Sequence, residues 1–159
     1  MVHRGIASLA LSLGLCFLLL SHFDAQFFLI HFYESLIYLA IVLMLFYFED
    51  RWAYMMGIVA PIAWLILNLA WSGASGLARD VSLAFHATNP FFPTGLLTSL
   101  AVVLSFGLIA TCAYRWRREF AGLHRGWSTL LISIAVVGVY YAVLVLWILR
   151  WPPVAAWGG

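Results

Sequence analysis

Residues 26–48 read QFFLIHFYESLIYLAIVLMLFYF, a run that is long enough to cross a bilayer as a single helix. His31, Glu34, Ser35 and Tyr38 recur in it at helical spacing and share one face, while most of the remaining residues are apolar. An ionisable residue inside a membrane span is costly, so it normally faces protein or water and not lipid. The run therefore predicts a transmembrane helix whose polar face points into a helix bundle.

The composition of the whole chain agrees with a membrane protein. Of its 159 residues, 65% are hydrophobic and 9% are charged, and the mean hydropathy is +1.03. Soluble domains average about 25% charged residues, so we exclude a soluble protein. The net charge of +2 is too small for a nucleic-acid surface, and we expect no nucleic-acid partner. Cys16 and Cys112 stand alone in apolar runs, which is typical of small buried residues.

Four further apolar runs predict a single-domain, all-α integral membrane protein with five transmembrane helices over residues 1–159. The expected spans are residues 5–21, 26–48, 52–72, 95–114 and 128–149. The first two connections are tight turns, and residues 73–94 form the long connection. Within it, Leu77, Val81 and Phe85 repeat at helical spacing against Arg79 and Asp80. This pattern predicts a short amphipathic helix at the membrane interface between the third and fourth spans.

The distribution of arginine predicts the orientation of the helices. One side of the membrane would hold Arg4, Arg51, Arg115, Arg117, Arg118 and Arg125, and the other side only Arg79 and Arg150. Because basic residues are enriched in cytoplasmic segments, we expect the N-terminus inside and the C-terminus outside, in the cell (inner) membrane. The group formed by Arg115, Arg117, Arg118 and Arg125 is interpreted as an anchor for anionic lipid headgroups, at about 1 kcal/mol per charge.

This topology places most of the polar side chains of the spans near the outer surface. The resulting hypothesis is a ligand-binding or proton-linked cluster in the outer leaflet, made of His31, Glu34, Ser35, Tyr38 and Asn68. The third span carries Gly57, Pro61 and Asn68 on one face, which we expect to contact the polar face of the second span.

Three functions remain open at this point. In the first, the cluster only fixes helix register, and the chain is a non-enzymatic subunit of a larger membrane complex, redox or energy-converting, or a self-associating protein. In the second, the chain binds a metal, haem or pigment. In the third, it is a small proton-coupled carrier that uses Glu34. The candidate ligands of a metal such as copper, or of a haem, are His22, Asp24, His31 and His86.

The arginine distribution makes a direct prediction about topology. A reporter fused after Gly159 should be active outside the cytoplasm, and one fused after Glu119 should be active inside, because the arginine-rich segment stays in the cytoplasm. Activity measured in intact cells checks both fusions. The reverse pattern would move His31 and Asn68 to the cytoplasmic side and contradict the orientation.

Overall fold

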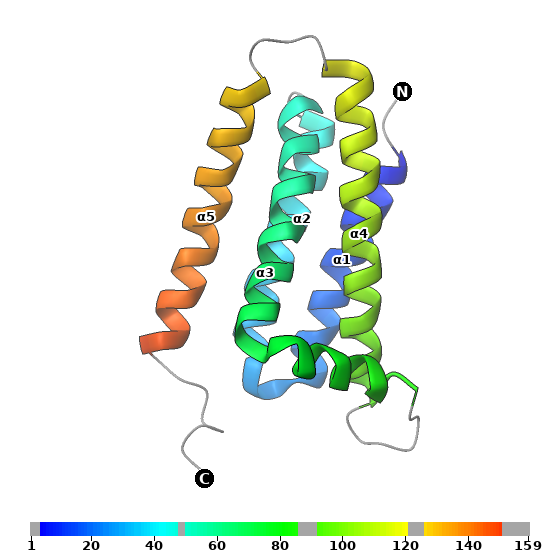
Figure 1. Ribbon diagram of the computed structural model, residues 1–159, viewed down its shortest axis with the longest axis vertical. Helices are drawn as coiled ribbons and strands as arrows, with labels where there is room; N and C mark the ends of the chain where they lie inside the picture. The colour runs from blue at the N-terminus through cyan, green and yellow to red at the C-terminus, as the bar shows by residue number, and fades with distance from the viewer. Residues whose placement is uncertain (1–3, 48–49, 86–91, 121–125, 151–159) are drawn as a thin grey trace.

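The computed structural model describes residues 4–47, 50–85, 92–120 and 126–150, and in these residues the regular structure is entirely helical (Figure 1). In chain order the elements are α1 (Arg4–Phe23), the short 3-10 helix η1 (Ala25–Phe27), α2 (Phe28–Tyr47), α3 (Asp50–Leu83), α4 (Phe92–Phe120) and α5 (Gly126–Arg150). Five of the helical segments are long and apolar enough to cross a membrane. The predicted all-α fold with five helices of this kind is therefore confirmed for the described residues, and their length and composition indicate a multi-pass membrane protein.

Helix α4 extends beyond the predicted span of residues 95–114 at both ends, because it begins at Phe92 and continues to Phe120. Two pairs at i,i+4 spacing explain the extra turns at its C-terminal end. Nη1 of Arg115 lies 3.4 Å from Oε1 of Glu119, and Nη1 of Arg118 donates a hydrogen bond of 3.2 Å to the Tyr114 hydroxyl. Two of the arginines interpreted as headgroup anchors therefore also stabilise the helix end. Arg117 is exposed there, and Arg125 lies outside the described residues.

Helix α3 packs tightly against α4 at Gly57. A Cβ atom added to Gly57 would lie 2.6 Å from Sγ of Cys112, so any larger residue there would force the Cys112 side chain to shift. In lipid, small residues drive helix association because they let two backbones come close. The expectation that Gly57 faces α2 is therefore wrong: α3 turns this glycine toward α4, its most extensive partner.

An aromatic contact joins the first three helices at the middle of the bundle. The Phe17 ring stacks on Tyr38 at 5.4 Å between centroids and meets the edge of Trp64 at 5.1 Å. All three side chains are buried, and Ile41 follows Tyr38 on the same buried face of α2. Aromatic pairs of this geometry stabilise beyond the area they bury, so this contact fixes how α1, α2 and α3 lie together.

Helix α3 changes direction at Gly73. The backbone there leaves the helical region, with φ at 67° and ψ at 174°, which glycine tolerates because it has no Cβ. The segment after it is helical up to Leu83 and crosses one end of the bundle toward the start of α4 (Figure 1). A helix in this connection agrees with the amphipathic pattern. Its position at a membrane interface stays a prediction.

The α3–α4 contact can be tested by enlarging Gly57. Gly57→Leu should lower the melting temperature in mild detergent, because overpacking a tight contact costs about 1–3 kcal/mol. The matched control is Gly138→Leu in α5, where an added Cβ would meet no atom within 4 Å. That variant should be neutral or slightly more stable, since glycine is a poor helix former. Equal melting temperatures for both variants would contradict the close α3–α4 contact.

Candidate functional site

The site begins at the turn between α1 and α2, where Asp24 is held by its own backbone. Its N–H donates to the Leu20 carbonyl at 2.8 Å, and its carbonyl accepts from the Phe27 N–H at 3.0 Å. These bonds complete the end of α1 and open η1, as expected for a tight turn at this point. They place the Asp24 carboxylate beside the first turns of α2.

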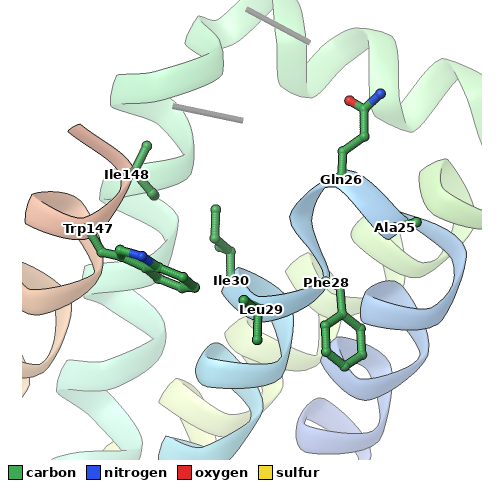
Figure 2. A pocket seen from close by; sticks show the side chains of 7 residues that line it. All are labelled: Ala25, Gln26, Phe28, Leu29, Ile30, Trp147 and Ile148. Carbon is green, nitrogen blue, oxygen red and sulfur yellow. The ribbon is translucent and has the colours of Figure 1, made fainter. Parts of the chain in front are cut away.

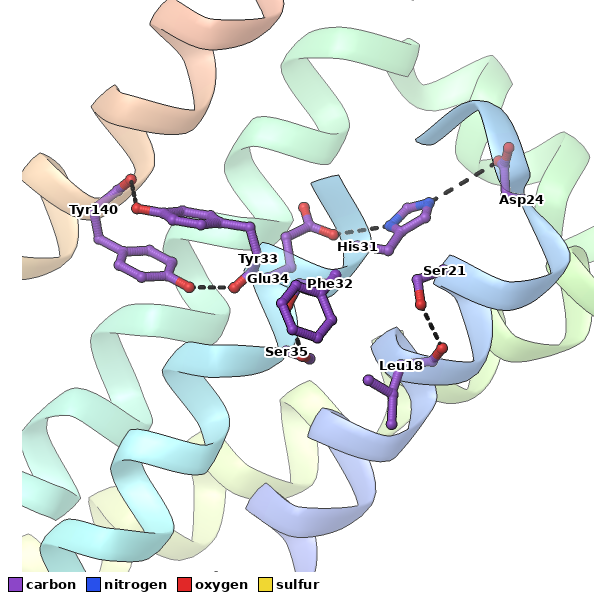
Figure 3. A network of polar contacts seen from close by, with 9 residues as sticks. All are labelled: Leu18, Ser21, Asp24, His31, Phe32, Tyr33, Glu34, Ser35 and Tyr140. Atoms are coloured by element: carbon purple, nitrogen blue, oxygen red, sulfur yellow. Dashed lines mark hydrogen bonds and ion pairs between the residues drawn. The ribbon is translucent and has the colours of Figure 1, made fainter. Parts of the chain in front are cut away.

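His31 lies between two carboxylates (Figure 3). Its Nδ1 is 3.0 Å from Oε2 of Glu34, one helical turn further along α2, which is hydrogen-bond distance. Its Nε2 is 4.0 Å from Oδ2 of Asp24, which is too long for a hydrogen bond but close enough for electrostatic attraction. We call Asp24, His31 and Glu34 the carboxylate–imidazole cluster.

Burial increases along this cluster from the turn into the bundle. The Asp24 side chain is 32% exposed, His31 is 21% exposed and Glu34 is 10% exposed. An ionised carboxylate at the Glu34 position would cost several kcal/mol without a partner, and His31 supplies that partner. When Nδ1–H donates to Glu34, Nε2 of a neutral His31 offers a lone pair, whereas an imidazolium offers a second N–H. The cluster is therefore rich in hydrogen-bond acceptors.

The cluster lines a cavity of about 870 Å³ at this end of the bundle. Most of its lining is apolar, with Trp64, Leu67 and Trp71 from α3 and Leu144 from α5. Asn68 and Arg79 add polar groups from α3, and Thr98 adds one from α4. Cavities of 300–1,000 Å³ with apolar walls and a few polar groups are typical of ligand sites.

The residues of the predicted cluster do not all take part in this cavity. His31, Glu34 and Asn68 line it. Ser35 is buried beside it, and its hydroxyl donates to the Phe32 carbonyl of its own helix at 2.6 Å. Tyr38 lies one turn deeper, stacked on Phe17. Helical spacing predicts that all these residues share one face of α2 or α3. It does not predict how deep the cavity reaches, and therefore which of these residues line it and which pack beneath it.

The candidate metal ligands are only partly described. His22 is exposed and its ring lies against Phe23, with 5.3 Å between centroids. His86 lies outside the described residues. Within residues 4–47, 50–85, 92–120 and 126–150, no group of three or more His, Cys, Asp or Glu side chains is placed to hold a metal ion. The metal and haem hypothesis stays a prediction that depends on His86 or a second copy of the chain.

Two tyrosines connect α2 to α5, and sequence reasoning did not pair them. The Tyr33 hydroxyl donates to the Tyr140 carbonyl at 3.1 Å, the Tyr140 hydroxyl donates to the Tyr33 carbonyl, and the rings stack with centroids 4.3 Å apart (Figure 3). We call this pair the tyrosine clasp. Both acceptors are backbone carbonyls, so no residue pattern marks them. The buried Tyr54 hydroxyl also donates to the Glu119 carboxylate at 3.1 Å, and the sequence pattern did not predict this contact either.

Comparisons of the chain with protein-family models, with curated proteins and with solved structures gave no match. Function is therefore inferred from the geometry of the site.

Proposed function

We propose that this protein binds, within the bilayer, an amphipathic lipid whose headgroup donates hydrogen bonds. The observation that carries this proposal is the cavity of about 870 Å³, which combines apolar walls with the carboxylate–imidazole cluster. Three of the polar side chains that were expected to fix helix register, those of His31, Glu34 and Asn68, thus also border a space large enough for a ligand. We place the protein in the cell (inner) membrane, as the arginine distribution predicts.

The walls of the cavity favour the hydrocarbon part of a lipid. The cavity presents the aromatic and aliphatic surface of Trp64, Leu67, Trp71 and Leu144. Such walls offer water few hydrogen bonds, so filling the space with water is unfavourable. Lipid chains are the most abundant apolar molecules around a transmembrane bundle. A hydrocarbon chain in the cavity would supply van der Waals contacts that the helices around the cavity do not make with each other.

The cluster favours a headgroup with an ammonium or hydroxyl group. The carboxylates of Asp24 and Glu34 accept hydrogen bonds, and charge-assisted bonds to an ammonium are about twice as strong as neutral ones. A purely anionic headgroup at this place would be repelled by the same carboxylates. Arg79, which lines the cavity from α3, suits a phosphate. A zwitterionic headgroup such as phosphoethanolamine satisfies both charges.

The other functions expected from the sequence stay predictions. A subunit role in a redox or energy-converting complex is compatible with lipid binding and depends on partners. A proton-coupled carrier needs access from both sides, whereas Phe17, Tyr38 and Ile41 fill the bundle directly below Glu34. Purification in mild detergent tests the subunit hypothesis and the metal or haem hypothesis. Further stoichiometric chains would support a complex, and a Soret band or bound metal would support a cofactor.

Photolabelling tests the proposed function directly. The probe is a lysophosphatidylethanolamine with a diazirine on its acyl chain, added to the protein in nanodiscs and compared with the matching lysophosphatidylglycerol. After irradiation, mass spectrometry should find label on Trp64 and Leu67 in the cavity, and more from the ethanolamine probe. Glu34→Gln should reduce this cavity labelling about tenfold at low probe concentration, because it removes a charge-assisted bond of roughly 1.5 kcal/mol.

Ser35→Ala is the matched control for this experiment. It changes the neighbouring buried residue, whose hydroxyl bonds only within its own helix in the described structure, and it should leave labelling unchanged. Label confined to lipid-facing residues such as Val139 and Leu146, with none on Trp64 or Leu67, would show that no lipid occupies the cavity. Equal labelling by both probes would contradict the proposed headgroup.

A further inference from the structure

We infer that the lipid enters the cavity sideways from the bilayer, through a portal between α2 and α5 that is closed by Ile30 and Ile148. This inference rests on the proposed function, and it deepens it: the ligand is a lipid taken from the membrane and not a metabolite taken from water.

A second, smaller hollow marks the portal on the outside of the bundle. It has a volume of about 220 Å³ and lies between the start of α2 and the end of α5 (Figure 2). Phe28, Leu29 and Trp147 line it and are exposed, so in a membrane they face lipid. This hollow is therefore a groove that hydrocarbon chains can reach.

The groove and the cavity share part of their lining. Ala25, Gln26, Ile30 and Ile148 border both spaces. Ile30 extends from α2 and Ile148 from α5, on the two sides of the gap that Figure 2 shows. Each of the two isoleucines is half-buried. A pair of aliphatic side chains therefore separates the interior cavity from the lipid-facing groove.

Beyond the tyrosine clasp, Tyr141 and Leu144 keep α5 against the core of the bundle, and the cavity and the groove lie between this part of α5 and α2. The clasp holds α5 to α2 at Tyr140, and Leu144 is the last buried residue in the described part of α5. Leu146 and Leu149 of the same helix are exposed. The clasp therefore sets the inner limit of the portal.

The end of the bundle is a less favourable route. The segment of α3 after Gly73 crosses it and contributes Arg79 and Leu83 to the cavity lining. Opening the side requires the rotation of two side chains, those of Ile30 and Ile148. Side-chain rotations are far faster than helix motions. A lateral route also keeps the lipid chain in hydrocarbon throughout its passage.

The rate of cavity labelling tests the portal. The diazirine lysophosphatidylethanolamine is added to nanodiscs holding the full chain, and samples are irradiated after increasing delays. Ile148→Trp should slow the appearance of label on Trp64 and Leu67 about tenfold, the effect of 1.36 kcal/mol of added barrier. Ile148→Ala should accelerate it. Leu146→Trp, two residues away on the exposed face of the same helix, should leave the rate unchanged.

The possible results separate the portal from the proposed function. Equal rates for Ile148→Trp, Ile148→Ala and the unmodified chain, with full cavity labelling, would overturn the portal and leave lipid binding intact. Absence of cavity labelling in the unmodified chain would overturn the proposed function, and the portal with it. If Ile148→Trp does not fold, Ile30→Trp obstructs the same gap from α2 and should slow labelling likewise.

Discussion

A carboxyl group inside a transmembrane helix must be neutralised or paired, and the rest of this structure depends on how Glu34 meets that requirement. Its partner is His31, one turn away on α2 and 3.0 Å from the carboxylate. The pair determines which face of α2 turns inward, because lipid would penalise the opposite orientation. Asp24 then extends the pair toward the turn that joins α1 to α2. The cluster therefore positions the helix hairpin and supplies the polar wall of the cavity with the same three side chains.

The bundle combines one tight helix contact with one loose contact, and this contrast creates the cavity. Gly57 brings α3 so close to α4 that a larger side chain would displace Cys112. By comparison, α5 is held to α2 by the tyrosine clasp and leaves a groove beyond it. Close helix contacts give a membrane protein its stability, and loosely held ends provide the low-cost motion that binding requires. The proposed portal lies at the loose end.

The sequence alone predicted the five spans and the inward face of α2, because span length and helical periodicity depend on local residue order. It also selected His31, Glu34 and Asn68, which line one cavity in the structure. It did not predict that Gly57 faces α4, since a small residue indicates a close contact but not the partner helix. The tyrosine clasp was missed because its acceptors are backbone carbonyls, which every residue possesses. The cavity itself results from the spacing between helices, for which the residue pattern carries no direct signal.

In the proposed function, the cavity beside Glu34 holds a lipid in the membrane. The most direct measurement is a crystal structure of the protein extracted from its own membrane and crystallised from a lipidic phase. A bound lipid should give continuous elongated density along Trp64 and Leu67, with its polar end within hydrogen-bond distance of Glu34 or His31. A cavity filled with ordered water, or closed by α5 lying directly against α2, would contradict the proposed function.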